Sequence, residues 1–252
     1  MAKKVDASFL YDLHSYYGRI GHDPFDAHKQ MQAKRMGGHE YLLSDHVEAM
    51  IKALLSNQRP WQYIDKRLDD IEAIFFRYDI EKIKETPGEY FEIQLRKIKC
   101  GNRQIKKQMA ALHENIHTME QVATEYGSLD AFVTSKPAEN IVRLFTTKYK
   151  LRQMGNALTW EYLRNIGIDG AKPDKHLRLF LGRLGFSRNS PAPATVEEVL
   201  EIVNKLHELS NWELAKIDAY IWNFCADGYA EICSEKPKCY KCPVRIYCNF
   251  TV

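Results

Sequence analysis

The sequence predicts an all-α fold, and three observations support this prediction. Apolar residues recur with a period of about 3.6, as they do from Val47 through Met50 to Leu54. No convincing segment alternates apolar and polar residues in the way that a half-buried strand requires. Breaks rich in glycine and proline divide the periodic segments into roughly ten helices with short connections.

Helix starts are marked by side chains that can accept hydrogen bonds from the first backbone N–H groups. Ser44 precedes the apolar stripe that begins at Val47, which predicts a helix from about that position. Thr118, Thr195 and Ser210 each stand three residues before a Gln or Glu, which is the pattern of a capping box. Each of these three residues is therefore predicted to open an amphipathic helix.

Composition narrows the class of protein. The 252 residues are 45% hydrophobic, which is enough to bury a real core in one large or two small domains. The opening MAKK is not followed by an apolar segment, and no apolar stretch approaches the length of a membrane span. The expectation is a soluble, intracellular, cytoplasmic protein without a targeting signal.

Positive charge is only mildly in excess. Lys and Arg number 36 against 33 Asp and Glu, a net charge of +3 that does not by itself indicate a nucleic-acid partner. Basic residues are nevertheless concentrated between Arg96 and Lys107. Such a run fits either a solvated helix face or a surface for nucleic acid.

Four clustered cysteines near the end of the chain form its most specific motif. They are Cys233, Cys239, Cys242 and Cys248, spaced C-x5-C-x2-C-x5-C among basic and aromatic residues. In a reducing compartment, such a cluster favours metal or iron–sulfur ligation over disulfides. Four thiolates suit both a [4Fe–4S] cluster and a tetrahedral zinc ion. Cys225, by contrast, continues an apolar stripe and is expected in the core.

A second motif occupies residues 151–184. A helix is expected to end near Leu151, followed by a tight turn containing Gly155 and a second helix from Asn156. A turn of this kind can direct backbone N–H groups at a phosphate. Asp174 then opens another helix. Aspartate commonly caps a helix start, and the helix dipole there favours an ionised carboxylate.

In this order the motifs resemble those of the endonuclease III-like helix–hairpin–helix DNA glycosylases. In that superfamily a Leu-Pro-Gly-x-Gly hairpin precedes an Asp-x-His segment with the catalytic aspartate, and a four-cysteine loop holds a [4Fe–4S] cluster. The resemblance places Leu151–Gly155 at the hairpin, Asp174 at the catalytic aspartate and His176 at the histidine. Ala53–Gln58 is similar to the family's Leu-Leu-Ser-x-Gln segment, whose glutamine enters the duplex. Lys99–Ile105 is similar to the family's Gly-x-x-x-Lys-Ala loop.

The resemblance implies a two-domain helical architecture and a DNA N-glycosylase of the base-excision-repair type. A helical barrel domain with the hairpin would cover residues 40–165. A second domain would join residues 1–39 to residues 166–252 and carry the cysteine loop (233–248). The partner would be double-stranded DNA with a damaged, mispaired or modified base, which is rotated out of the stack. The protein is expected to act as a monomer associated with the nucleoid.

Site residues follow from the same resemblance. Asp174 would be catalytic, because a carboxylate can stabilise a sugar with oxocarbenium character and activate water. The four cysteines would hold the [4Fe–4S] cluster, with zinc as the alternative. The aromatic residues that could stack on the extruded base, or simply pack between helices, are Trp61, Tyr63, Trp160 and Tyr162. The DNA contacts would be Gln58, Arg152, Gln153, Met154, Gly155, Asn156, Lys172, Lys175 and His176.

Three departures from the family pattern affect the expected chemistry. The first cysteine interval is one residue shorter than the commonest spacing, C-x6-C-x2-C-x5-C. The hairpin has Arg152-Gln153 in place of Pro-Gly. Where bifunctional members carry a Schiff-base lysine, this chain has Ala157, which cannot form an imine. We therefore expect hydrolytic base removal without strand cleavage, and the identity of the base stays open.

Other functions are compatible with the same residues. A displaced lysine, Lys172 or Lys175, would give a bifunctional glycosylase with lyase activity. A non-catalytic DNA-damage-binding protein could use the cysteine loop as a purely structural element. A zinc-dependent transcription factor is a further alternative.

Overall fold

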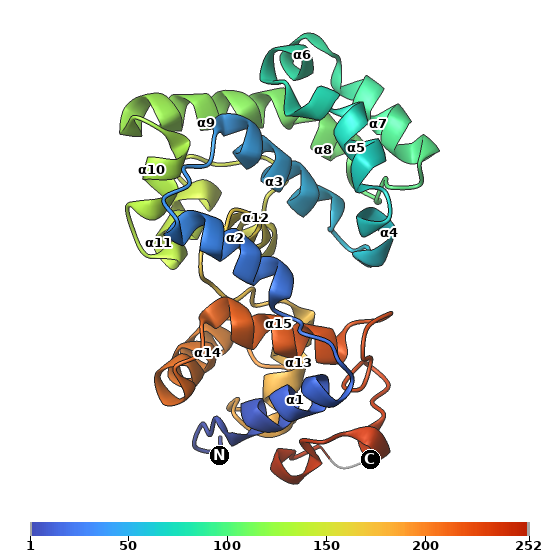
Figure 1. The fold of residues 1–252 in the computed structure, drawn as a ribbon, viewed down its shortest axis with the longest axis vertical. Coiled ribbons are helices and arrows are strands. Elements are labelled where there is room, and N and C mark those ends of the chain that lie inside the picture. The colour runs from blue at the N-terminus through green and yellow to red at the C-terminus, as the bar shows by residue number, and fades with distance from the viewer. Residues whose placement is uncertain (1, 251–252) are drawn as a thin grey trace. The chain divides into compact units, whose positions relative to one another are not determined.

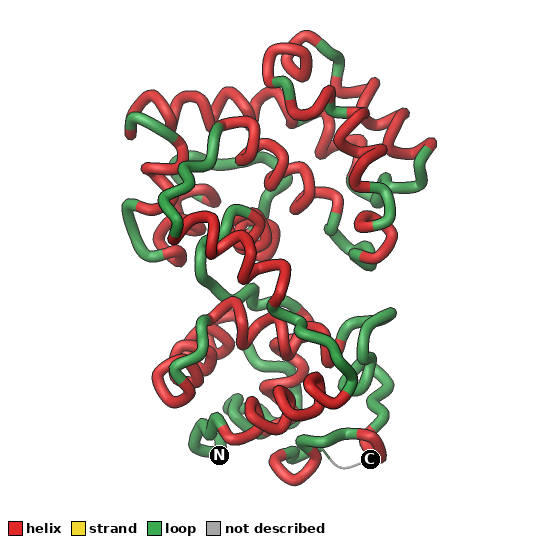
Figure 2. Tube along the Cα trace, in the orientation of Figure 1, coloured by secondary structure: helices red, strands yellow, loops and turns green. Residues whose placement is uncertain are grey.

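Every secondary-structure element in the described part of the chain is helical. The structure, a computed structural model, describes residues 2–250. Within this range it contains fifteen α-helices and three short 3₁₀ helices and no strand, which confirms the all-α prediction (Figure 2). The sequence predicted fewer helices, because helices as short as α4 (Gln62–Asp65) contain too few residues to show a period.

The chain divides into two compact units. Unit 1 combines the described residues of Met1–Gln30 and Asp169–Val252, and unit 2 is Met31–Ile168. The sequence placed the boundaries at 39/40 and 165/166. The first observed boundary lies inside α2 (Asp26–Met36), a helix that continues from one unit into the other. Since no glycine or proline interrupts this helix, the sequence carries no break at that point.

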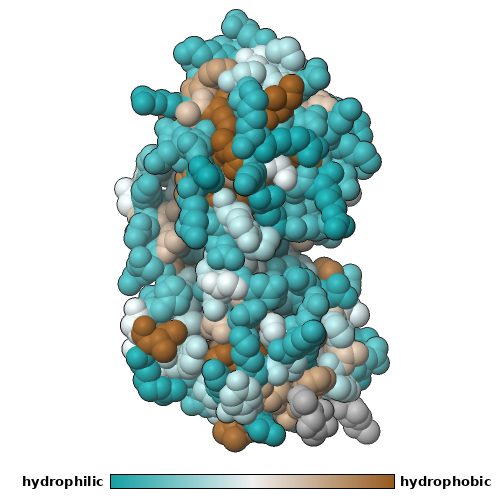
Figure 3. Space-filling view, turned by 90° about the vertical axis from the view of Figure 1, so that its right-hand side faces the viewer, coloured by the Kyte–Doolittle hydropathy of each residue, from teal (hydrophilic) through white to brown (hydrophobic). Residues whose placement is uncertain are grey.

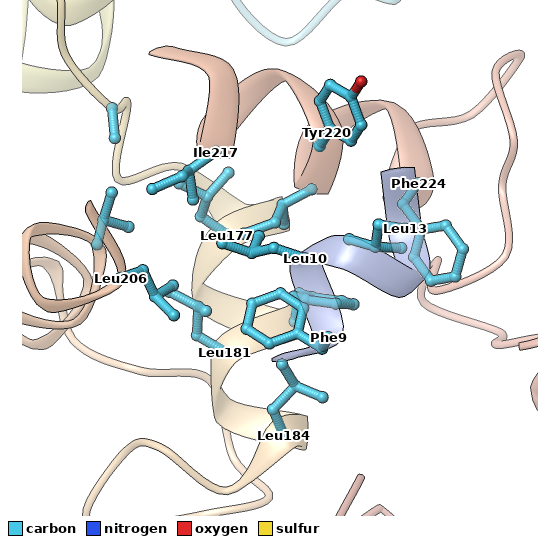
Figure 4. Close-up of a cluster of buried hydrophobic side chains, with 14 of the residues drawn as sticks. Phe9, Leu10, Leu13, Leu177, Leu181, Leu184, Leu206, Ile217, Tyr220 and Phe224 are labelled. Atoms are coloured by element: carbon cyan, nitrogen blue, oxygen red, sulfur yellow. The ribbon is translucent and has the colours of Figure 1, made fainter. Parts of the chain in front are cut away.

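Unit 1 is built around α15. This helix packs against α1, α13 and α14. Phe9, Leu10 and Leu13 of α1 are completely buried among side chains of α13 and α15 (Figure 4). The complete helices of unit 1 are α1 (Ser8–Arg19), α13 (Lys175–Leu184), α14 (Val196–Ser210), α15 (Leu214–Cys225), η2 (Cys239–Lys241) and η3 (Arg245–Tyr247) (Figure 1).

Unit 2 is built around α3. Eight of its thirteen residues are buried, because α3 packs against α8, α9, α10 and α12. The helices that follow α2 in unit 2 are α3 (Leu43–Leu55), α4 (Gln62–Asp65), α5 (Leu68–Ile74), η1 (Phe76–Tyr78), α6 (Ile80–Glu85), α7 (Gly88–Lys97), α8 (Ile105–Ala110), α9 (Leu112–Tyr126), α10 (Leu129–Thr134), α11 (Ala138–Thr146) and α12 (Asn156–Asn165).

One of the three predicted capping boxes is confirmed. Thr195 caps α14, with its hydroxyl accepting from Glu198 N and the Glu198 carboxylate accepting from Thr195 N. Thr118 lies inside α9, where its hydroxyl donates to the carbonyl of Glu114 (2.9 Å). A hydroxyl can bond the preceding turn in this way, so the pattern alone does not mark a start. Ser210 is the last residue of α14, so that prediction is also wrong.

A buried polar cluster joins four helices of unit 2. Arg35 donates to both carboxylate oxygens of Asp130 (2.8 and 3.0 Å), and His46 Nε2 lies 3.5 Å from Asp130 Oδ1. The other ring nitrogen of His46 is 2.6 Å from the hydroxyl of Tyr162. Burial would raise the pKa of Asp130, but His46 and Arg35 outweigh burial and lower it well below its ordinary value. Burial lowers the pKa of His46, so this histidine is neutral at neutral pH.

Polar residues predominate on the face shown in Figure 3, where hydrophobic side chains form separate patches. Among the described residues, no helix has both the length and the apolar character needed to cross a bilayer.

Candidate functional site

Asp174, the predicted catalytic residue, is the N-cap of α13 in unit 1. Its Oδ1 accepts hydrogen bonds from the backbone N–H groups of His176 (2.8 Å) and Leu177 (3.3 Å). Because both bonds end on Oδ1, capping leaves Oδ2 to other partners. The side chain is half-buried, so solvent reaches it. The fold therefore fixes an accessible carboxylate at the positive end of a helix dipole.

The two lysines that flank Asp174 differ in their settings. Lys175 is exposed, and its Nζ lies 3.9 Å from Glu235 Oε1, a surface pair that contributes little to stability. Lys172 is half-buried. Its backbone N–H donates to Asp218 Oδ2 at 2.8 Å.

His176 is half-buried beside Asp174. Its ring stands edge-on to that of Trp222, with 5.9 Å between the centroids. Burial lowers the pKa of His176, against the opposing charge of Asp174, so the ring is neutral at neutral pH.

A cavity of about 560 Å³ opens next to the first turns of α13 within unit 1. This volume is in the range of small-molecule sites. Lys175, Arg178 and Lys236 in the lining are balanced by as many acidic residues, so the lining does not select a ligand by charge. The acidic residues of the lining are Asp227, Glu231 and Glu235.

The predicted hairpin lies in unit 2 between α11 and α12. Helix α11 ends at Thr146, earlier than the expected end near Leu151. The connection is held in place by Asn115 of α9, which accepts from Arg152 N (2.6 Å) and donates to Arg152 O (3.0 Å). Met154 is only 3% exposed, so its side chain belongs to the core rather than to a DNA-facing surface.

The start of α12 is open. Its N-cap is Gly155, which has no side chain to bond the first N–H groups of the helix. Gly155, Asn156 and the preceding Gln153 are exposed. A Cβ built on Gly155 would meet no atom within 4 Å, so the space in front of the helix is clear. This end of α12 has the properties of an anion-binding site.

Gln58 lies in an exposed turn directly after α3, also in unit 2. Its φ of 53° is in the left-handed region, which is uncommon for residues other than glycine and needs support from its surroundings. Arg59 supplies this support, because its guanidinium donates to Gly101 O (3.0 Å) and to Lys99 O. The turn with Gln58 and the loop that begins at Lys99 therefore lie side by side.

The aromatic candidates separate into two pairs. Trp160 and Tyr162 are 4% and 0% exposed, so of the two predicted roles they have that of packing between helices and not that of stacking on an extruded base. Tyr63 is 54% exposed, with the Arg59 guanidinium 5.5 Å from its ring centroid. Trp61 is half-buried. Of the four candidates, Trp61 and Tyr63, which follow α3, are therefore the two that stay accessible to a base.

No disulfide joins the clustered cysteines, and their side chains influence one another. Burial raises the pKa of Cys242 to about 11, and the neighbouring thiols of the cluster add to this effect. Cys233 behaves oppositely. A hydrogen bond with Cys225 and the guanidinium of Arg183 lower its pKa to about 7. As predicted, Cys225 is a core residue, and it is completely buried.

Arg183 of α13 anchors the cysteine loop. Its guanidinium is buried and donates to Ser234 O (2.7 Å) and to Cys233 Sγ (3.3 Å). Its carbonyl accepts from Asn249 N (2.7 Å) and from the thiol of Cys248 (3.3 Å). The first and last cysteines of the motif are therefore both tied to one residue of α13, the helix that Asp174 caps.

The donor set of the loop fits thiolate ligation. Besides four thiols and a buried cation, it has a backbone donor, since Phe250 N–H lies 3.4 Å from Cys248 Sγ. N–H···S bonds and burial tune thiolate centres. In residues 2–250, no three His, Cys, Asp or Glu side chains are arranged to hold a metal ion. The loop thus offers the thiols that a thiolate centre would need.

Two solved structures are similar to this chain. One is the Methanocaldococcus jannaschii 8-oxoguanine glycosylase/lyase in complex with a 15mer DNA containing 8-oxoguanine, with a TM-score of 0.59 and 18% identity, over 86% of this chain and 96% of that one. The other is the 8-oxoguanine DNA glycosylase of Thermotoga maritima, with a TM-score of 0.61 and 19% identity, over 86% and 95%. The chain has the fold of a DNA glycosylase. No family model and no curated protein matches the sequence.

The predicted resemblance to helix–hairpin–helix DNA glycosylases is thus confirmed at the level of the fold. The structure brings Asp174, Lys172, Lys175 and His176 together at the start of α13, and it ties the cysteine loop to the same helix. The hairpin and Gln58 belong to the other unit, where each occupies an exposed connection.

Sequence reasoning missed Arg183 and Asp218, two charged residues that hold the site in place. Both are buried, with 5% and 0% exposure. A signal was present in each case, because each stands on an apolar stripe, Arg183 after Phe180 and Asp218 before Ile221. A charge at a core position is rarely tolerated unless it has partners, so it marks a built contact.

Proposed function

We propose that this protein is a DNA N-glycosylase that removes a damaged, mispaired or modified base by hydrolysis. The observation that carries the proposal is the carboxylate of Asp174, which is fixed through Oδ1 at the start of α13 and remains accessible. The fold and the open start of α12 are consistent with this activity, since a glycosylase must grip the phosphate backbone while it handles one nucleotide.

Asp174 would act on the sugar. Breaking the N-glycosidic bond leaves positive charge on the deoxyribose ring, and a carboxylate close to that ring stabilises this charge and can polarise an attacking water. Since Oδ1 is engaged by two backbone N–H groups, Oδ2 would face the sugar. Gln58, in its exposed turn, would occupy the space that the extruded nucleotide leaves.

The absence of a lysine at position 157 supports a monofunctional enzyme, because Ala157 has no amine to form an imine with the sugar. A second candidate is a bifunctional enzyme, since the similar M. jannaschii protein is described as a glycosylase/lyase. Lys172 and Lys175 are the amines next to Asp174 in the chain. Trapping with borohydride separates the two, because only an imine is reduced to a stable protein–DNA adduct.

We further propose that the four cysteines hold a [4Fe–4S] cluster. When bound, this group would serve as a structural cross-link rather than as a reactant. It would fix a loop with four exposed or half-buried cations for contact with phosphates, namely Lys236, Lys238, Lys241 and Arg245. Iron, sulfide and zinc analysis of the purified protein, with its visible absorption spectrum, distinguishes the cluster from zinc.

A panel of duplex oligonucleotides tests the activity. The panel contains 8-oxoguanine, oxidised pyrimidines, alkylated purines and mismatches, and abasic products are revealed by alkali. The expected result is alkali-dependent cleavage at one class of lesion, with no adduct after borohydride. Tight binding to a lesion without base release across the panel would support the non-catalytic damage-binding protein instead.

A further inference from the structure

The segment that leads to Asp174 is attached to α15 at two points. Asp169 accepts from the N–H groups of Ala215 (2.8 Å) and Leu214 (3.2 Å) and so caps the start of α15. Asp218, one turn further along α15, accepts from Lys172 N at 2.8 Å. The segment between these attachments has no regular secondary structure of its own. Its path is therefore set by α15.

The second attachment leads directly to Asp174. The N–H of Lys172 donates to the carboxylate of Asp218, and its carbonyl accepts from Asp174 N at 2.7 Å. Pro173, between them, is buried and has a fixed φ. Displacement of the Lys172 peptide would consequently move the backbone of Asp174.

Asp218 is itself held rigidly. It is completely buried, and its neighbours Ile217 and Ala219 are 0% and 3% exposed. Figure 4 shows Ile217 and Tyr220 of α15 in the packed core, where Leu177 of α13 also lies. A buried carboxylate loses its hydration, and unless partners compensate for this loss it destabilises the fold. A carboxylate at this buried position must therefore have a role that an apolar side chain could not perform.

We propose that Asp218 is a positioning residue for Asp174, an inference that rests on the proposed role of Asp174 in base removal. Asp218 fixes the Lys172 peptide and thereby sets the place of the carboxylate relative to the sugar. A shift of about 1 Å in a reacting group can lower a rate by about 100-fold. The contribution of Asp218 would thus appear in the rate of the chemical step rather than in DNA binding.

Two substitutions test this role. Asp218→Asn keeps an oxygen that can accept from Lys172 N–H, whereas Asp218→Leu fills the space and removes the acceptor. The control is Thr195→Ala, which removes a capping bond of α14 in the same unit without touching the approach to Asp174. Single-turnover base release and affinity for lesion DNA are measured at a temperature at which thermal unfolding shows every variant to be folded.

The expected result is a single-turnover rate about 100-fold lower in Asp218→Leu, with an unchanged Kd. In Asp218→Asn the rate should stay within about fivefold of the unmodified protein, because the neutral acceptor is weaker but present. Thr195→Ala should release the base at the normal rate. The positioning role is wrong if the unmodified protein is active and Asp218→Leu releases the base at the same rate. It is also wrong if the rate falls equally in both Asp218 variants and in Thr195→Ala. If the unmodified protein releases no base from any lesion, the proposed function fails and this inference fails with it.

Discussion

The helices α12 and α13 both begin at predicted DNA-facing residues, yet they begin in opposite ways. The first N–H groups of α12 follow Gly155 and have no side-chain acceptor. Those of α13 are engaged by the carboxylate of Asp174. An uncapped start leaves its positive dipole end for an external anion, whereas a capped start uses that end to hold its own carboxylate. The same element can thus bind a phosphate or position a catalytic group, depending on one residue.

The largest expected effect comes from Asp174→Asn. Asparagine caps a helix about as well as aspartate, so the free energy of unfolding should change by about 0.5 kcal/mol or less. Base release should nevertheless fall about 1000-fold, because the charge that stabilises the sugar is gone. Single-turnover assays and chemical denaturation of the same preparation measure both quantities. Normal base release by Asp174→Asn would show that Asp174 is only a cap.

Giving α12 a carboxylate cap like that of α13 should raise stability and weaken DNA binding. Gly155 has a φ of −83° and free space at its Cβ, so Gly155→Asp is compatible with the fold. The new carboxylate should raise stability by about 0.5 kcal/mol and weaken DNA binding about tenfold, since it occupies and repels the phosphate site. Gly155→Ser, a cap without charge, is the matched control. Equal binding by both variants and the unmodified protein would exclude this helix start from the DNA interface.

A smaller effect is expected from Arg152→Ala in the hairpin. The side chain is 52% exposed and pairs with Glu114 at 2.6 Å, so its loss should leave stability nearly unchanged. If Arg152 contacts a phosphate, binding should weaken about equally for all sequences, and the salt slope of log K should decrease by about one. Titrations at several salt concentrations measure this slope. An unaltered slope would show that the Arg152 side chain contacts no phosphate, so that any phosphate contact of the hairpin is made by its backbone.

The smallest effect concerns pH and the first turn of α13. Burial lowers the pKa of His176 below its ordinary 6.5, so the folded state binds a proton less readily than the unfolded state. Stability should therefore be complete above pH 6.5 and decrease as the pH falls below it. His176→Gln should remove part of this loss of stability at low pH. The rest should persist, because the pKa of His46 in unit 2 is also lowered. Denaturation curves from pH 7 down to about 5 test the sign.

The sequence predictions succeeded most often where the interacting residues are close together in the sequence. The box of Thr195 and Glu198 was correct because both partners lie in one turn. Thr118 shows the same spacing inside α9, where a hydroxyl bond to the preceding turn replaces the cap. The start of α15 is capped by Asp169, which is distant in sequence, and no local pattern could reveal it.

The sequence alone determined the all-helical class, the cysteine spacing and the place of Asp174 at a helix start, because each depends on residues a few positions apart. Only the tertiary structure decided that Arg183 holds the cysteine loop, that Asp218 holds the approach to Asp174, and that Trp160 is packed away from solvent. These contacts join segments tens of residues apart. They exist because helices bury their apolar faces against one another, and the partners of each buried polar group are fixed only when that packing is complete.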